Sequence, residues 1–407
     1  MAAQGKDQII PSQGPPARKL VSVRTIADIK PIKGNRHLEV AKIDGWNVVV
    51  VKGDYTIGQF VVYFEVDSFL PNTEDRFWEY CQPHKVQEYN GQSGYVVKTS
   101  MKHGTISQGV IFPLSTFPEI EKARIGLENQ LGGSELTVEA LQQMDFASAL
   151  GVKKYDSVYF DAAGYYGQPP IFFPQPGCER AQNVTSLFQE FSDTTFQITE
   201  KLDGLPMTIY HVRKDSGWYH ALPRNRDSGT ERPEYGVCGR EHDYIQHEKS
   251  VFWIAAKNQN VIKKLRRLGR NLAVQGELCG SSIMANSMGF AEGEHRFYVF
   301  GIYDIDRAAW MNANKAFGLC KELNLTHAPV LGRMKLSNFA SSIDELLEKA
   351  EGKGVLGQNR EGLIFRTPNN SWGFKVIANS WLLKYGQHKV DQWGSSNNED
   401  NNHVGHF

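Results

Sequence analysis

A lysine two residues before an Asp-Gly pair, directly after a strand-like run, is the feature that most constrains this chain. Residues 196–199 alternate apolar and polar side chains, and Lys201, Asp203 and Gly204 follow. Asp-Gly is a turn signal, so the lysine amine is placed where a strand becomes a turn. An amine fixed there can attack phosphorus if nearby groups favour its neutral form and hold the phosphate. An exposed turn beside a solvated lysine is the simpler alternative, and the downstream residues decide between the two.

Length and composition limit the alternatives. The 407 residues suggest two or three domains, and 45 basic residues balance 45 acidic ones, so any nucleic-acid surface must be a local patch. The five cysteines are scattered and never spaced Cys-x-x-Cys, which argues against a disulfide framework or zinc site. The first 17 residues lack the apolar core of a signal peptide, and no run is long enough to span a membrane. We expect an intracellular protein, cytoplasmic or nuclear, without a membrane partner.

Short strands broken by glycines dominate residues 20–117, after an N-terminus (residues 1–19) expected to be disordered. Asp44-Gly45 marks a hairpin between two of the strands. About five strands in a hundred residues predict a small β-barrel, with the OB fold a natural candidate and other small barrels or sandwiches as alternatives. The expected strands are residues 38–43, 46–51, 60–66, 94–97 and 110–114.

Residues 118–182 are expected to connect two domains. They contain a predicted helix over 137–150 and a segment rich in aromatic residues, Gly and Pro. The second domain is expected over residues 183–393, and a Ser/Asn/His-rich tail, residues 394–407, is expected to be disordered.

The second domain mixes helices and strands. A long helix is predicted over residues 248–271, and Ser342 with Glu345 forms a capping box for a helix ending near Glu351. Apolar runs at 272–274, 297–303 and 362–365 predict buried strands. One side of the long helix is apolar, with Phe252, Ile254, Ile262, Leu265 and Leu268.

Four later elements each supply a group that nucleotide transfer requires. Glu277 follows a glycine at a strand and can accept hydrogen bonds from ribose hydroxyls. Phe300 belongs to an aromatic strand whose side chains can stack on a base. Glu361 places a second carboxylate at the start of a strand, and Lys375 adds a cation that can neutralise phosphate charge. Singly, each residue is of a kind more often structural; together and in this order they are specific.

The order of Lys201-Leu-Asp-Gly, Glu277, the Phe300 strand, Glu361-Gly and Lys375 resembles the motifs of ATP-dependent ligases and mRNA capping enzymes. DNA ligases and capping enzymes usually carry an arginine two residues after the motif glycine, where this chain has Pro206. They also carry an OB domain after the last motif, whereas Lys375 lies only 32 residues before the end of this chain.

The barrel-like region comes first instead, as in the nick-sealing RNA ligases with an N-terminal OB domain, which the chain resembles over about residues 20–385. The runs Gln275-Gly-Glu-Leu, Val237-Cys-Gly-Arg240 and Phe374-Lys-Val-Ile-Ala-Asn are also similar to that group. Many ligases have Lys-x-Lys in the last motif, but position 377 is Ile377, and Lys384 is the candidate substitute. The resemblance implies an α+β protein in which a nucleotidyltransferase domain of antiparallel sheets and helices follows the barrel.

The resemblance also implies a reaction. Lys201 would take AMP from ATP as a lysyl-AMP, pass it to an RNA 5′-phosphate, and a 3′-hydroxyl would then displace AMP. Mg²⁺ or Mn²⁺ is expected at the phosphates, held by few protein ligands and near Glu361. The family implies further roles: Glu200 or its neighbouring backbone for the adenine amino group, Phe300 for stacking, Glu277 for ribose, Asp203 and Gly204 for the turn, and Arg240 for the nucleotide or the RNA end.

RNA itself is the expected partner, as a nicked duplex or broken ends, and the protein is expected to be a monomer. In the barrel, Lys98, Lys102 and His103 with Tyr95 suit OB-type binding, although a simple surface loop is an equal alternative. The long helix carries further cations that can follow a phosphate backbone, or can form an ordinary solvated face. They are Lys257, Lys263, Lys264, Arg266, Arg267 and Arg270, of which Lys263 and Arg267 are the chosen candidates.

The alternatives are a DNA ligase or capping guanylyltransferase, and a non-catalytic protein that binds nucleic-acid ends or tRNA with an inert transferase fold. The missing C-terminal barrel and Pro206 argue against the first two. The presence of Lys201, Glu277, Glu361 and Lys375 together argues against inertness, because a decayed site would have lost a charged group. No histidine has metal-ligand spacing with a carboxylate, so none is assigned to a metal.

Overall fold

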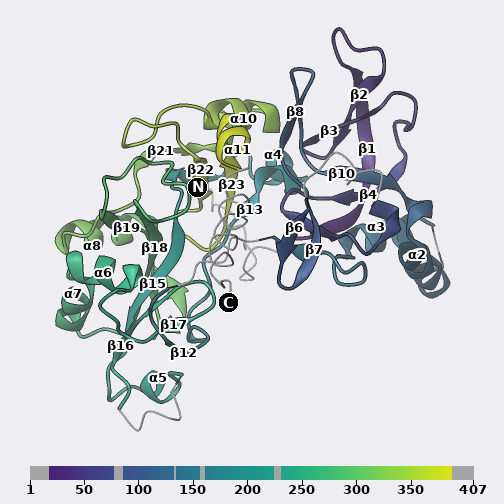
Figure 1. Cartoon of the computed structure of the whole chain (residues 1–407). Coiled ribbons are helices and arrows are strands. Elements are labelled where there is room, and N and C mark those ends of the chain that lie inside the picture. Colours follow the sequence, from purple (N-terminus) through teal and green to yellow (C-terminus); the bar gives the residue numbers. More distant parts are fainter. Residues whose placement is uncertain (1–17, 78–85, 133, 156–160, 224–230, 387–407) are drawn as a thin grey trace, which may run out of the picture. The chain divides into compact units, whose positions relative to one another are not determined.

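The chain folds into two units, each with its own sheets and core (Figure 1). The computed structural model describes residues 18–77, 86–132, 134–155, 161–223 and 231–386. A barrel unit contains residues 18–155 together with 182–185 and 379–386, and a sheet unit contains 161–181 and 186–378. Of the N-terminus that was expected to be disordered, only residues 18 and 19 are described. The tail 394–407, also expected to be disordered, lies outside the described residues. No helix among those described is long and apolar enough to cross a membrane.

Two antiparallel sheets form the barrel unit and share one core. The first has the order β10-β4-β1-β2-β3 and the second β11-β5-β7-β6. The turn between β2 and β3 contains Asp44, with φ of +49°. The first sheet contains β1 (Val21–Pro31), β2 (Leu38–Ile43), β3 (Trp46–Val51), β4 (Phe60–Phe64) and β10 (Val110–Pro113). The second contains β5 (Ser68–Pro71), β6 (Gln87–Tyr89), β7 (Gln92–Val96) and β11 (Lys153–Lys154), and a separate hairpin pairs β8 (Ser100–Lys102) with β9 (Thr105–Ser107).

Two helices pack on this barrel, in the part of the chain where the sequence predicted a connector with one helix. They are α2 (Pro118–Leu131) and α3 (Ser134–Gln143), and Ile120 and Leu141 pack against Val21 and Phe64 of the barrel. The predicted helix over 137–150 is wrong beyond Gln143. The reason is Asp145, whose Oδ1 accepts hydrogen bonds from the backbone N–H groups of Val21 and Ala147, so the local backbone turns instead of continuing the helix.

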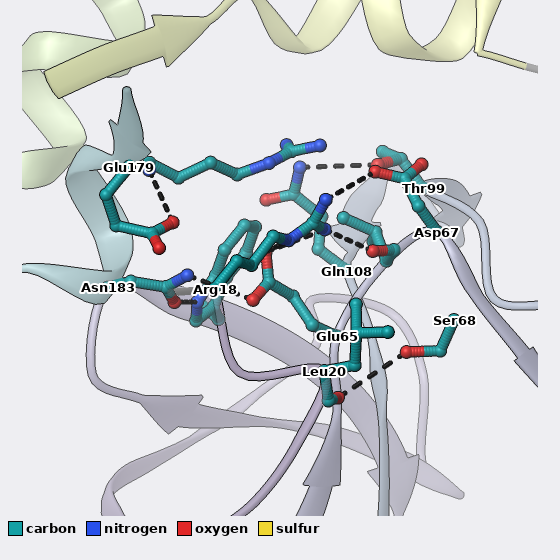
Figure 2. Close-up of polar contacts among 12 residues, drawn as sticks. Arg18, Leu20, Glu65, Asp67, Ser68, Thr99, Gln108, Glu179 and Asn183 are labelled. Carbon is teal, nitrogen blue, oxygen red and sulfur yellow. Dashed lines mark hydrogen bonds and ion pairs between the residues drawn. The ribbon is translucent and has the colours of Figure 1, made fainter. Parts of the chain in front are cut away.

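Residues 182–185, at the expected start of the second domain, belong to the barrel unit. The backbone N–H of Gly45 donates to Gln182 O at 3.2 Å, and a Cβ at position 45 would collide with Gln182. Trp46 Nε1 donates to Asn183 Oδ1 at 2.7 Å, and Asn183 Nδ2 donates to the fully buried Glu65 at 2.9 Å. Arg18 Nε donates to the other oxygen of Glu65 at 2.8 Å (Figure 2). The charge of Glu65 is therefore neutralised and both of its oxygens are hydrogen-bonded.

The sheet unit is built on two sheets. The larger has the order β12-β17-β16-β15-β18-β19-β20, and the smaller β13-β23-β22-β14-β21. The larger contains β12 (Tyr165–Gly167), β15 (Leu205–His211), β16 (Tyr235–Cys238), β17 (Asp243–Tyr244), β18 (Leu272–Gly280), β19 (His295–Asp304) and β20 (Ala309–Trp310). The smaller contains β13 (Glu179–Arg180), β14 (Thr195–Lys201), β21 (Val330–Lys335), β22 (Gly362–Arg366) and β23 (Gly373–Ile377).

Helices pack on these sheets. The predicted long helix over 248–271 is wrong as one element: it is broken into α6 (Val251–Asn258) and α7 (Val261–Leu268) at Asn260, whose φ of +52° ends the first helix. Phe252 and Leu265 are buried against the larger sheet, as expected. Half of the expected capping box is present in α10 (Ile343–Ala350), where Ser342 Oγ accepts from Glu345 N, whereas the Glu345 carboxylate accepts from Ser341 N. The other helices are α4 (Leu187–Glu190), α5 (Gly217–His220), α8 (Ala313–Glu322), α9 (Leu336–Phe339) and, in the barrel unit, α11 (Asn379–Tyr385).

A buried ion pair stabilises the edge of the larger sheet. Arg232 contacts Asp243, and both side chains are almost completely buried. Tyr210 donates its hydroxyl to Asp243 at 2.6 Å, and the Arg232 guanidinium lies 3.4 Å from the ring centroid of Tyr166. The pair therefore connects β12, β15 and β17 with the segment before β16.

Candidate active site

Lys201 is the last residue of β14, and its amine is held by a carboxylate from the neighbouring strand. Lys201 Nζ donates to Glu361 Oε2 at 2.7 Å. Glu361 directly precedes β22, where Gly362 pairs with Lys201 in the antiparallel ladder. A Cβ at position 362 would collide with Val376 O of β23, so only glycine permits this close approach. The strand pairing therefore fixes the separation of the amine and the carboxylate.

The register of the smaller sheet places Lys375 on the same face as Lys201. Thr199 pairs with Ile364, and Ile364 pairs with Lys375 across the next ladder. Since side chains alternate along a strand, Lys201, two residues after Thr199, shares that face. Lys375 also pairs with Arg180 in the parallel ladder of β13 and β23, and Arg180 is buried.

The turn after Lys201 is fixed by two contacts. Ser287 Oγ donates to Asp203 Oδ2 at 2.7 Å, and both residues are buried. Gly204 approaches β18 so closely that a Cβ would collide with Leu278 O. The Asp-Gly pair thus lies in the short connection between β14 of the smaller sheet and β15 of the larger one, and its aspartate accepts a hydrogen bond from a loop residue.

Acidic groups gather around Lys201. Glu277 lies within β18, where it pairs with Pro206 of β15 and Tyr298 of β19. Burial raises the pKa of the Cys279 thiol, and the nearby charges of Glu277, Asp203 and Glu361 raise it further, whereas Lys201 lowers it. Three carboxylates and one amine therefore lie close to one buried thiol. Among the described residues, no three such groups are arranged to ligate a metal by themselves.

Glu200 precedes Lys201, and the two side chains line one pocket. Burial raises the pKa of its carboxyl, while a hydrogen bond from the Val355 backbone N–H, at 2.9 Å from Oε2, opposes that shift. A Cβ on Gly354 would collide with the other oxygen, Oε1. The pocket is lined by Glu200, Lys201, Asp203, Ser287, Gly354, Gln358 and Glu361, among others.

Phe300 sits at an irregularity in the larger sheet. Gln275 pairs with Gly301 and Gly276 with Val299, so Phe300 is the additional residue of a β-bulge. Its ring packs on a cluster that includes Leu202 and lies 4.9 Å, centroid to guanidinium carbon, from Arg366. Bulges re-aim side chains near active sites, and this one turns an aromatic ring toward the residue that follows Lys201.

Other expected residues lie apart from this pocket. Arg240 is exposed in the turn between β16 and β17 and does not line it. Lys384 lies on α11, where its Nζ is 4.8 Å from the Tyr385 ring centroid. In the barrel, Lys102 is exposed at the end of β8 and Lys98 is half-buried. Tyr95 is buried in the barrel core, so the expectation that it offers a surface aromatic group is wrong. Lys263 and Arg267 are exposed on α7.

Three residues near the site were not predicted from the sequence. Ser287 and Gly354 come from loops, where no periodicity marks a residue as functional. Arg180 lies in a two-residue strand, too short to leave a sequence pattern. Arg360 precedes Glu361 but serves the fold: its guanidinium donates to the carbonyls of residues 349–351 at the end of α10.

Comparisons with known proteins give the family to which this chain belongs. The RNA ligase family model matches residues 194–385, and an OB-fold domain model matches residues 20–114. The structure is similar to that of Naegleria gruberi RNA ligase in a lysine-to-alanine variant with ATP and Mn, with a TM-score of 0.76 and 30% identity over 90% of this chain and 99% of that chain.

The same enzyme in a glutamate-to-alanine variant with AMP and Mn gives a TM-score of 0.76 and 31% identity, over 91% of this chain and 99% of that chain. Its structure with PPi gives 0.75 and 32% identity with the same coverage. No match was found among the curated proteins. The predicted α+β architecture, with an OB fold before a ligase domain, is confirmed, and the chain belongs to the RNA ligase family.

Proposed function

We propose that this protein is an ATP-dependent RNA ligase that seals 3′-hydroxyl and 5′-phosphate ends, with nicks as its substrate, through a lysyl-AMP at Lys201. The observation that carries the proposal is the Lys201 amine, fixed at a strand end 2.7 Å from Glu361 in a pocket that also contains Glu200 and Asp203. Similar structures hold ATP or PPi, the substrate and the leaving product of such a first step, or AMP, the group that the step would transfer.

In the first step the Lys201 nitrogen attacks the α-phosphorus of ATP. A nitrogen–phosphorus bond forms, the bond to the bridging oxygen of pyrophosphate breaks, and the amine proton is released. The ion pair with Glu361 holds the amine in place. Lys375, on the same sheet face, supplies positive charge that stabilises the α-phosphate as the bonds change.

The nucleotide would be held by Glu200, which lines the pocket, and by Phe300 and Glu277, which lie on strands outside its lining. Glu200 is fixed by Val355 N and faces the pocket, which suits it to accept a hydrogen bond from the adenine amino group. The ring of Phe300 would stack on the base, and the carboxylate of Glu277 would accept hydrogen bonds from the ribose hydroxyls. Arg240 is exposed and apart from the pocket, so a contact with the RNA end fits its position better than one with ATP.

The carboxylates near Lys201 could supply some, but not all, of the ligands of a divalent ion. Asp203, Glu277 and Glu361 offer carboxylate oxygens near Lys201, but no group among the described residues forms a complete cage. Mg²⁺ or Mn²⁺ would therefore be held by a few of these carboxylates, Glu361 first, together with phosphate oxygens and water. When bound, the ion supplies charge neutralisation at the phosphates.

The last two steps transfer the adenylyl group and join the ends. An oxygen of the RNA 5′-phosphate attacks the AMP phosphorus, the bond to Lys201 breaks, and the amine regains a proton. A 3′-hydroxyl then attacks the activated 5′-phosphate, loses its proton, and AMP leaves. Positioning and neutralisation of charge carry most of the catalysis in such in-line displacements.

Labelling with ATP tests the first step. The protein is incubated with α-labelled ATP or GTP and Mg²⁺ or Mn²⁺, alongside Lys201→Ala and the matched control Lys214→Ala, an exposed lysine paired with Glu231. Acid-labile, alkali-resistant label from ATP in the wild type and control, absent from Lys201→Ala, supports the proposal. Label from GTP redirects it to capping. No label from either nucleotide in folded protein leaves an inert, nucleic-acid-binding fold.

Sealing of RNA is the second assay. The substrate is a duplex with one nick bearing a 3′-hydroxyl and a labelled 5′-phosphate, in RNA and DNA versions, with unpaired strands compared. We expect joined RNA at the nick to exceed both joined single strands and joined DNA. If a labelled enzyme joins no RNA ends, the assignment of ligation fails even though adenylylation stands.

A further inference from the structure

A groove on the sheet unit, separate from the active-site pocket, combines unmatched positive charge with an apolar floor. The α6–α7 groove is defined by Tyr235, Trp253, Lys257, Lys263, Arg266 and Arg267. Its volume is about 660 Å³, within the range of ligand pockets, and it shares no lining residue with the pocket at Lys201. Figure 1 shows α6 and α7 beside each other, and α7 packs on β15.

Three of the four cations that define this groove have no acidic partner among the described residues. Arg266 pairs with Glu234 at 2.8 Å, but Lys257, Lys263 and Arg267 are exposed and make no ion pair with any residue that the structure describes. Lys263, Arg266 and Arg267 follow the three- and four-residue spacing that places them on one side of α7. Since the whole chain has no net charge, three uncompensated cations around one groove form a local positive field.

The floor of the groove suits a flat, apolar group. Tyr235 is half-buried, packs edge to face on Trp253 at 6.3 Å between ring centroids, and has the Arg266 guanidinium carbon 5.9 Å from its own centroid. An aromatic ring beside arginine is a platform on which a nucleic-acid base stacks. A fully paired helix presents phosphates to such a groove, whereas an unpaired strand presents phosphates and a base.

We infer that the α6–α7 groove binds an unpaired RNA strand, with a base against Tyr235 and phosphates against Lys257, Lys263 and Arg267. This inference rests on the proposed function, because it assigns part of the substrate to a surface away from the reacting ends. The nicked or broken RNA then extends beyond its paired region onto the sheet unit. An acidic protein segment would satisfy the charges but would leave the aromatic floor without a stacking partner.

Fluorescence anisotropy of the full-length protein tests this assignment. The probes are a fluorescein-labelled single-stranded RNA of 12 nucleotides and the same strand in a blunt duplex, titrated at several salt concentrations. The test variant is Lys263→Ala/Arg267→Ala. The matched control is Lys315→Ala/Lys321→Ala, which removes two exposed lysines from α8.

We expect the test variant to raise Kd for single-stranded RNA at least ten-fold and to reduce the slope of log K against log salt by about 1.4, the value for two lost phosphate contacts. Tyr235→Leu should weaken single-strand binding several-fold and leave duplex binding unchanged, while Tyr235→Phe retains the stacking ring and the affinity. The control pair should change neither probe.

Three results would overturn the inference. They are unchanged single-strand affinity in the test variant, equal losses for strand and duplex, and displacement of the RNA by a poly-glutamate peptide at lower concentration than by unlabelled RNA. Labelling of Lys201 by ATP is measured in parallel and needs no RNA. If the test variant loses RNA affinity but the wild type is never labelled by ATP, the proposed function fails and the groove assignment stands. If the protein is labelled and seals RNA but the test variant keeps its RNA affinity, the groove assignment fails and the proposed function stands.

Discussion

The Lys201 amine and the Glu361 carboxylate lie 2.7 Å apart although 160 positions separate them in the sequence. The antiparallel pairing of β14 with β22 brings them together, because Lys201 pairs with the residue that follows Glu361. The contact holds the amine at one point of the sheet edge. Glu361 is therefore placed to set the position of the nucleophile.

Replacing Glu361 should damage the first chemical step more than nucleotide binding. We expect Glu361→Gln to lower the rate of ATP labelling about 100-fold, the order found when a charge-stabilising group is removed, with a smaller change in KM for ATP. Single-turnover labelling measures both quantities. Glu322→Gln, an exposed glutamate at the end of α8, is the control. A labelling rate close to that of the wild type would show that the ion pair with Lys201 is only structural.

Adding a methyl group at Gly354 should move Glu200 without unfolding the protein. A Cβ there would collide with the Glu200 carboxylate, whose end can shift, and the backbone of Gly354 is not in the left-handed region. We expect Gly354→Ala to raise KM for ATP several-fold and to leave thermal stability almost unchanged. Gly126→Ala, where nothing lies within 4 Å of the added atom, is the control. An unchanged KM would remove Glu200 from the proposed adenine contact.

Breaking the buried pair of Arg232 and Asp243 should destabilise the sheet unit strongly. Asp243→Asn leaves the Arg232 charge without its buried partner, which costs about 3–5 kcal/mol in unfolding free energy. Urea unfolding monitored by tryptophan fluorescence measures the change. Asp215→Asn breaks the exposed pair with Arg213, where little change in stability is expected because the pair is solvated. Similar losses from the two variants would contradict the difference in burial.

The carboxyl of Glu345 should give α10 a pH-dependent contribution to stability. A hydrogen bond from Lys349, followed by those from the backbone and side chain of Ser341, lowers the pKa of Glu345 to about 2. Because the unfolded group titrates near 4.5, this contribution is complete above pH 4.5 and is lost as the pH falls toward 2. Glu345→Gln should thus be less stable than wild type at pH 7, with a smaller difference at pH 3. Glu348→Gln, on the same helix, should show no such convergence.

Local patterns predicted several strands of the barrel but not its longest one. The strands at 38–43 and 46–51 match β2 and β3 because apolar alternation and the Asp44-Gly45 turn are both local signals. β1 was not predicted, since Asp28 and Lys30 interrupt its apolar pattern and its position depends on pairing with β2 and β4. The helix break at Asn260 was missed for a related reason: the apolar positions continue through it.

The residues of the candidate site likewise fall into those that the sequence predicted and those that it did not. Lys201 and Asp203 could be proposed because they follow a strand-like run and precede Gly204, and Glu361 because it directly precedes a glycine at the start of an apolar run. Ser287 and Gly354 could not, because their roles depend on loops that reach Asp203 and Glu200 only in the folded chain. Tyr95 was misjudged because alternation along a strand does not say which of its two faces is buried.

The attachment of residues 182–185 to the barrel unit bears on how this protein can be divided by proteolysis or gene truncation. Asn183 joins Trp46 to Glu65, so a fragment that starts the ligase domain at residue 183 takes this contact away from the barrel. The barrel fragment would then retain a buried Glu65 with one oxygen lacking its donor, a defect worth about 1–3 kcal/mol. A dissection that ends the barrel fragment after residue 185 keeps the donor, and independent folding of the barrel is best sought with that boundary.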